Sequence, residues 1–302
     1  MPASSNKRPL DPAADAALLR ELKLAAIQQR RKLLALGRTL RIRLHYGATM
    51  SSVEILTALY RVWLRIDPEN AGWPERDRFV LSKGHAAPAL YVTLAMRGFF
   101  PEDEFANFRR LHSILQGHPD RNKTPGVDCS TGSLGQGFPV ACGMALGAKA
   151  DHAPFRVYTL ISDGECNEGS VWEAALIAAN LKLDTLTVLV DWNRKSSYGP
   201  MEGRNDIEPL ADKWRAFGWA VFECDGHDFV SLTRALAAAE RVSGRPVVLL
   251  CHTVKGKGIP FAETHPTRSN FALTPEQDQE AVAYLDTLET EITDESFAPR
   301  HH

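Results

Sequence analysis

Asp163 and Asn193 each follow an apolar run, and both carry side-chain oxygens of the kind that bind divalent cations. The run TLIS precedes Asp163-Gly164, and the run TLTVLV leads to Asp191-Trp192-Asn193. If both runs are strands of one parallel sheet, their carboxyl ends share the edge where ligands of such sheets bind. Gly164 would also let a phosphate approach the backbone closely. Taken alone, an Asp-Gly pair after a strand fits an ordinary capped turn equally well.

The elements that must position these residues alternate between strands and helices. The expected strands are rich in Val, Leu and Ile, as is typical of strands buried on both faces, and they span 78–82, 156–162, 185–191, 220–224 and 246–252. Helices are expected near 86–97, 137–150, 169–182, 206–217 and 228–243, after a long helix over 15–43 and a second helical segment after Ser51. This alternation predicts an α/β fold, a parallel sheet with helices on both faces.

The amino-acid composition is typical of a globular protein. Hydrophobic residues make up 44% of the 302 residues, and the formal net charge of −2 gives no general attraction to nucleic acid or to an anionic membrane. There is no apolar run long enough to span a membrane, no apolar secretory segment at the start, and no metal or disulfide spacing among the five cysteines. We expect a cytoplasmic protein with a flexible tail over 1–14, one domain over 15–275, and a helix with a tail over 276–302.

The first long helix carries a cluster of basic residues. Arg30-Arg31-Lys32 is followed by Arg38, Arg41 and Arg43. Because the total charge is close to neutral, we interpret the cluster as a solvated helix face or a subunit contact, and not as a nucleic-acid stripe.

The spacing between the two polar residues at the strand ends favours a cation site over an ordinary capped turn. Asp163 and Asn193 lie 193 − 163 = 30 residues apart, and Glu168-Gly169 stands between them. This resembles the thiamine-diphosphate motif, GDG followed by Asn at a similar distance, and the stretch DGECNEGSVWEAALIAANLKLDTLTVLVDWN is similar to that of transketolases, with Ser162 in place of the first glycine. The resemblance implies a thiamine-diphosphate-binding (PP-type) fold. It also implies that the side chains of Asp163 and Asn193 and the carbonyl of Lys195 bind Mg²⁺, or Ca²⁺ or Mn²⁺, which bridges to the diphosphate.

Three histidines and a glycine-rich loop also match transketolase motifs. His45 lies in LHYGATMS, His85 in SKGHAAP and His118 in QGHPD, and each alone would be interpreted as a surface residue. The resemblance implies that they line the reactive side of the cofactor, where imidazoles move protons near neutral pH, and that His85 also reaches the diphosphate. The loop GSLGQG at 132–137 resembles the family's TGxLGQG loop, which implies cofactor contacts from Gly132, Ser133 and Leu134.

The resemblance extends to acidic residues and to one position where the family pattern is broken. It implies cofactor contacts from Gly164 and Glu165, and a catalytic place for Glu168 in a carboxylate network at a subunit interface, with Glu173 beside it. A family histidine that contacts the diphosphate is missing, and Arg268-Ser269-Asn270 stand there, with His265 displaced. We expect Arg268, with His265 as the second candidate, to take over this contact, because guanidinium binds phosphate oxygens in a bidentate manner. The alternative is that the loss of the histidine reflects a different substrate chemistry. Lys255 and Lys257 are expected to be solvated loop charges, with contact to an anion as the less favoured alternative.

The resemblance covers about residues 15–275, the N-terminal domain of a longer transketolase. The later domains supply the pyrimidine-binding glutamate on which cofactor activation depends. The chain therefore resembles the first subunit of split transketolases. The implied function is two-carbon ketol transfer from a ketose to an aldehyde acceptor, with a C-terminal partner subunit that carries the pyrimidine-binding domain, in an α2β2 heterotetramer. Three alternatives stay open: a two-carbon acyl transferase subunit of specialised metabolism, a 2-oxoacid dehydrogenase component, and a degenerate scaffold subunit.

Overall fold

The computed structural model describes residues 7–197, 199–264 and 270–294. Its centre is a five-stranded parallel sheet in the order β1-β2-β3-β7-β6. The strands are β1 (Arg78–Leu81), β2 (Val157–Ser162), β3 (Leu186–Trp192), β6 (Ala220–Asp225) and β7 (Val247–His252). A two-residue pair, β4 (Lys195–Ser196) and β5 (Gly199–Pro200), forms a small antiparallel ribbon after β3.

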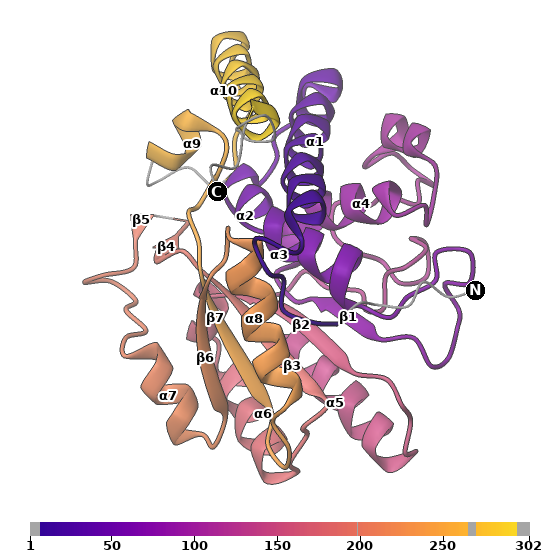
Figure 1. The fold of residues 1–302 in the computed structure, drawn as a ribbon, viewed down its shortest axis with the longest axis vertical. Coiled ribbons are helices and arrows are strands. Elements are labelled where there is room, and N and C mark those ends of the chain that lie inside the picture. Colours follow the sequence, from indigo (N-terminus) through magenta and orange to yellow (C-terminus); the bar gives the residue numbers. More distant parts are fainter. Residues whose placement is uncertain (1–6, 198, 265–269, 295–302) are drawn as a thin grey trace.

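Helices cover both faces of the sheet (Figure 1). One face carries α5 (Gly137–Ala150), α6 (Gly169–Asn180) and α7 (Leu210–Ala216). The other face carries α1 (Ala16–Leu40), α3 (Val53–Ala58), α4 (Ala87–Met96) and α8 (Phe229–Glu240). The short helices α2 (Tyr46–Ser51) and α9 (Pro260–Thr264) lie near the carboxyl ends of the strands, and α10 (Pro275–Asp294) packs along α1.

Side chains of each central strand alternate between two hydrophobic cores. In β2, Tyr158 and Leu160 join the core beneath α1, α3, α4 and α8, whereas Val157 and Ile161 join the core beneath α5, α6 and α7. Both sets are buried because both faces of the sheet are covered, which explains why the strand sequences are apolar without interruption. The predicted α/β class, with a parallel sheet between two helical layers, is confirmed.

The main differences from the expected elements lie at their ends. The helix expected over 206–217 begins only at Leu210, because Pro209 disfavours helical backbone in the residue before it. The long first helix ends at Leu40, where Arg41 adopts a left-handed conformation with φ 51°. None of the helices in the described ranges is both long and apolar enough to cross a membrane.

Residues 7–14 are not the loose tail expected from the sequence. Leu10 is buried, and its backbone N–H donates to Oγ1 of Thr233 on α8 at 3.0 Å. Arg8 pairs with Asp15 just before α1. The apolar side chain of Leu10 therefore fixes this segment to the body of the domain.

The basic cluster of α1 is paired within the chain. Arg31 contacts Asp286 at 2.6 Å and Glu289 at 2.7 Å, both on the acidic helix α10, and Lys32 contacts Glu102. Arg30 is buried and is not part of the solvated face expected from the sequence.

Candidate functional site

Asp163 and Asn193 lie at the carboxyl ends of two adjacent strands, β2 and β3. Asp163 is buried, and its Oδ2 accepts a hydrogen bond of 2.6 Å from the backbone N–H of Arg194. Its Oδ1 accepts from the N–H of Gly164 at 2.7 Å. Burial, together with the nearby charge of Asp191, raises the pKa of Asp163 to about 7. A cation beside this carboxylate would stabilise its charged form and so lower the pKa of Asp163 again.

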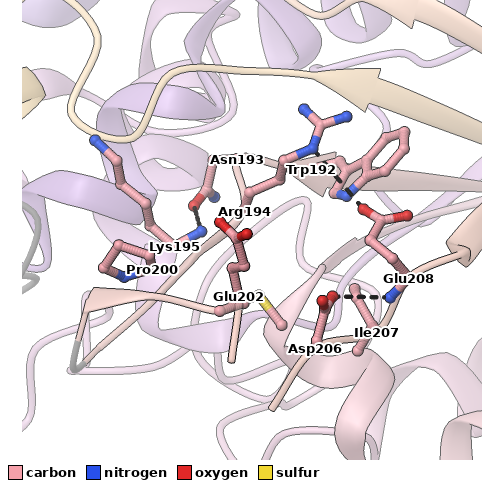
Figure 2. A pocket seen from close by; sticks show the side chains of 10 residues that line it. Trp192, Asn193, Arg194, Lys195, Pro200, Glu202, Asp206, Ile207 and Glu208 are labelled. Atoms are coloured by element: carbon pink, nitrogen blue, oxygen red, sulfur yellow. Dashed lines mark hydrogen bonds and ion pairs between the residues drawn. The ribbon is translucent and has the colours of Figure 1, made fainter. Parts of the chain in front are cut away.

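Asn193 and Lys195 bring two further oxygens to the same loop. Oδ1 of Asn193 accepts from the N–H of Lys195 at 3.1 Å, and the two residues border a cavity of about 510 Å³ (Figure 2). Among the described residues there is no group of three or more His, Cys, Asp or Glu that could hold a metal. The donor set here is instead one carboxylate, one amide oxygen and one carbonyl. Such a set fits Mg²⁺, which keeps further positions for phosphate oxygens and water.

A buried ion pair lies next to these residues. Lys83, just after β1, and Asp191, within β3, are both fully buried and contact each other. Asp191 also accepts from Oγ of Ser51 at 2.6 Å and from Thr253, and Nζ of Lys83 donates to the carbonyl of Ala48 at 3.0 Å. Burial alone would raise the pKa of Asp191, but Lys83 and these donors lower it. This pair was not predicted from the sequence, although a charge at the end of each apolar run was its signal.

Lys255 is buried, so the expectation that it is a solvated loop charge is wrong. Its ammonium donates to the carbonyls of Lys195 at 3.2 Å and Ser196 at 2.6 Å. Its aliphatic stem passes over Gly47, where a Cβ would come within 2.8 Å of Cε. Burial lowers the pKa of Lys255 to about 8, although the two nearby aspartates oppose this shift. Sequence alone did not reveal the burial, because it comes from a segment two hundred residues away.

The three predicted histidines come together from separate loops. The rings of His45 and His85 lie 5.2 Å apart between centroids, and His118 packs against Gly132. Burial lowers the pKa of all three, that of His85 to about 3, and the charge of Arg109 further lowers those of His45 and His118. All three imidazoles are therefore neutral at pH 7, and His45 and His118 can accept a proton more readily than His85. Arg109 was not among the predicted residues.

The glycine-rich loop at 132–137 lies against the turn that follows β2. Gly135 has φ +76°, and a Cβ there would come within 2.7 Å of Cβ of Glu168. In the same loop Ser133 is exposed, and Leu134 is half-buried. Only glycine suits position 135, because both its φ and its contacts exclude a side chain.

Glu165 connects this loop to the ends of β1 and β2. It is fully buried, and its Oε1 accepts from Oγ of Ser82 at 2.6 Å and from the N–H of Gly135 at 3.0 Å. Its Oε2 accepts from the N–H of Ser162 at 3.0 Å. These three hydrogen bonds give Glu165 the role of fixing the loop, and the cofactor contact expected of it stays a prediction.

The remaining predicted residues are less tightly placed. Glu168 and Glu173 are exposed at the beginning and on the outer side of α6, and no ion pair of either is found among the described residues. Arg268 and His265 lie outside the described residues.

The chain matches a family and several known proteins over most of its length. The family model of the transketolase thiamine diphosphate binding domain matches residues 29–282. The chain is 47% identical to the 6-deoxy-6-sulfo-D-fructose transketolase subunit SqwG of Clostridium sp. (strain MSTE9), over 80% of this chain and 88% of that one. It is 43% identical to a subunit of the apulose-4-phosphate transketolase of Actinobacillus succinogenes, over 82% of this chain and 89% of that one.

Solved structures show the same fold within longer chains. The transketolase of Campylobacter jejuni superposes with a TM-score of 0.78 at 28% identity, over 93% of this chain and 49% of that one. A fructose-6-phosphate complex of a transketolase variant from Pichia stipitis gives a TM-score of 0.79 at 27% identity, over 90% and 44%. The chain thus covers somewhat under half of these solved transketolases, and 88% and 89% of the two subunit relatives. The chain belongs to the transketolase family, and the part of that family to which it corresponds is the N-terminal, thiamine diphosphate-binding domain.

Proposed function

We propose that this chain is the cofactor-binding subunit of a two-subunit transketolase, which transfers a two-carbon ketol unit from a ketose to an aldehyde. The observation that carries the proposal is the meeting of Asp163, the Asn193–Lys195 loop and the buried Lys255 at the strand ends. Oxygen donors for a metal and a cation for phosphate oxygens thus adjoin each other. The family match and the two subunit relatives support it.

The residues divide into a metal side and a reactive side. On the metal side, Asp163, Asn193 and the carbonyl of Lys195 would hold Mg²⁺, with Ca²⁺ or Mn²⁺ as substitutes. Lys255 and the backbone at Gly164 would contact the diphosphate. Binding of the metal requires the ammonium of Lys255 to turn from the Lys195 carbonyl toward phosphate oxygens, a short movement for a flexible side chain.

The reactive side is formed by the histidines and the glycine-rich loop. Thiamine diphosphate, when bound, supplies a nucleophilic thiazolium carbon. His85 would also reach the diphosphate, and Gly132, Ser133 and Leu134 would line the flat ring. Because His45 and His118 are neutral at pH 7, they would accept protons from donor hydroxyls and return them to the product. His85, whose pKa is about 3, would act beside them as a neutral hydrogen-bonding group.

Arg109 is the candidate contact for the far end of the substrate. It is exposed, and its charge acts on both His45 and His118. The two subunit relatives are named for sugars with a sulfo group and a phosphate group, so their substrates carry an anionic tail. We propose that the donor or acceptor here is likewise anionic and that Arg109 attracts it.

Relatives of this length are named as subunits, which implies a partner subunit. We propose that this partner is a C-terminal subunit carrying the pyrimidine-binding domain, that the complex is an α2β2 heterotetramer, and that this chain alone is inactive. The contact between the two copies of this chain would use α5 and α6. Five of the seven exposed large apolar residues in the described part of the chain lie on or directly after these helices: Val140, Leu146, Leu176, Ile177 and Leu181.

The shape of this surface favours a second copy of the chain. Gly143 and Gly147 on α5 have no atoms within 4 Å of a Cβ placed on either, and α5 packs against α6, which carries the exposed Leu176 and Ile177. Under twofold rotation, bulky residues of one copy meet small residues of the other. We also propose that the enzyme works in the cytoplasm, which the five unpaired cysteines support.

Reconstitution tests the function. The full chain is co-purified with its C-terminal partner, and ketol transfer is measured in a coupled assay with Mg²⁺ and thiamine diphosphate. Asp163→Ala should abolish activity and cofactor binding, whereas Asp212→Ala, an exposed carboxylate on α7, should leave both unchanged. Full activity in the Asp163→Ala complex would refute the proposal.

A further inference from the structure

The loop at 254–258, between β7 and α9, is fixed by three backbone contacts. The N–H of Val254 donates to Nε2 of His227 at 2.8 Å, and the carbonyl of Lys257 accepts from Nε of Arg30 at 2.9 Å. Between them, the N–H of Gly256 donates to the carbonyl of Gly47 at 2.9 Å. The two side-chain contacts thus bracket Lys255, the cation that adjoins the proposed metal loop.

Both side-chain contacts are anchored by one carboxylate, Glu54 on α3. Its two oxygens accept from Nη1 of Arg30 at 2.6 Å and from Nη2 at 2.9 Å. The second oxygen also contacts Nδ1 of His227 at 2.9 Å. Glu54 and Arg30 are both buried. Burial alone would raise the pKa of Glu54, but Arg30 and His227 lower it to about 2, so the carboxylate is charged at neutral pH.

These contacts determine which nitrogen of His227 carries the proton. Nε2 accepts from the N–H of Val254, so it has no hydrogen, and Nδ1–H therefore donates to Glu54. A glutamine at position 54 cannot reproduce the network, because it offers one oxygen and one NH₂ group. If the NH₂ group faces His227, two donors point at each other as long as Nδ1 carries the hydrogen. If the hydrogen moves to Nε2 instead, Nε2 can no longer accept from the N–H of Val254.

We propose that Glu54 is a positioning residue, which acts through Arg30 and His227 to hold the 254–258 loop so that the ammonium of Lys255 lies at the metal and diphosphate site. These three residues lie on separate elements: Arg30 on α1, Glu54 on α3 and His227 in the turn between β6 and α8. Within the described part of the chain, none of them has a hydrogen bond to a proposed metal ligand. The inference rests on the proposed cofactor site.

The test measures the affinity of the complex for thiamine diphosphate at saturating Mg²⁺, by calorimetric titration, beside the melting temperature. Glu54→Gln should raise the Kd by about tenfold or more, the effect of losing one charge-assisted contact. Asp77→Asn is the matched control. Asp77 is also a buried carboxylate, which accepts from Lys7 and from the N–H groups of Arg65 and Arg156 at the amino end of β1, away from the site. It should lower the melting temperature and leave the Kd unchanged.

A double-mutant cycle tests whether Glu54 acts through Lys255. In a Lys255→Met background, Glu54→Gln should have little further effect on the Kd, because the group that it positions is gone. His227→Ala removes the contacts of this imidazole to Glu54 and to Val254, but leaves Arg30 on Glu54 and on the carbonyl of Lys257. It should therefore weaken binding in the same direction by a smaller factor, which provides a result if Glu54→Gln fails to fold.

The outcomes separate the two proposals. If Asp163→Ala and Lys255→Met bind the cofactor normally, the proposed site itself is wrong. If both weaken binding while Glu54→Gln and His227→Ala behave like Asp77→Asn, or if the Glu54 and Lys255 effects are additive, the positioning role is wrong.

Discussion

The carboxylate of Glu165 accepts a hydrogen bond of 3.0 Å from the backbone N–H of Gly135, and thereby joins the turn after β2 to the glycine-rich loop. The same oxygen accepts from Ser82, which follows β1. Three segments that are each proposed to contact the cofactor therefore meet at one buried side chain. The position of the loop relative to the metal ligands depends on this group.

Glu165→Gln should destabilise the chain and loosen the loop. The amide has one acceptor oxygen, so at least one of the donors Ser82, Gly135 and Ser162 would be left buried and unpaired, at a cost of about 1–3 kcal/mol. Urea unfolding of the full chain measures this loss. Glu168→Gln, at a nearby exposed position, should change the free energy of unfolding very little. Equal stability of the two variants would contradict the role of Glu165 in fixing the loop.

The sequence was sufficient for the sheet and for placing the proposed ligand residues at one edge of it, because strand positions follow from local patterns. The runs TLIS and TLTVLV had to be buried strands, and the polar residues at their ends had to share an edge of the sheet. His85 lies at the same edge because it follows β1, whereas the approach of the His45 ring to it depends on the packing of a separate loop.

Local sequence patterns could not predict which charged residues are buried. Arg30 stands beside Arg31 and Lys32, which are partly exposed, and only the helix packing places it against Glu54. Lys255 lies in a polar stretch, KGKG, and its burial depends on the distant Gly47. Long-range packing decides such cases, because a charged residue is buried only where the fold supplies its partner.

The half-buried His85, whose pKa is lowered, predicts a pH dependence of stability. The folded chain binds a proton on His85 only near pH 3, whereas the unfolded chain does so below about pH 6.5. Between these values the unfolded state holds more protons, so stability falls as pH falls, by up to about 1.4 kcal/mol per unit from this group. His85→Gln should reduce that slope between pH 6.5 and 4.5 in urea unfolding. His152→Gln, at an exposed histidine, should not. An unchanged slope in His85→Gln would contradict the burial.

Arg109→Ala tests the proposed contact with an anionic substrate. In the reconstituted complex, KM for a phosphorylated ketose should rise by about tenfold, while a neutral ketose should be affected little. The loss should shrink as salt rises, because the guanidinium is exposed. Arg110→Ala is the neighbouring exposed control, and its KM should match that of the unmodified enzyme. If KM rose equally for both ketoses, Arg109 would be shown to support the conformation of its loop and not to bind the anionic group.

Ile177→Lys tests the proposed contact between copies of the chain. Ile177 and Leu176 on α6 are 54% and 51% exposed, and a second copy seated there would bury both. A lysine would then be desolvated without a partner, so the mass of the complex in sedimentation should fall from that of two copies of each subunit to that of one. Leu111→Lys supplies the control, because Leu111 is 86% exposed and lies outside α5 and α6. A complex of unchanged mass with Ile177→Lys would show that the copies meet elsewhere, and the apolar surface of α5 and α6 would then be left for the C-terminal partner.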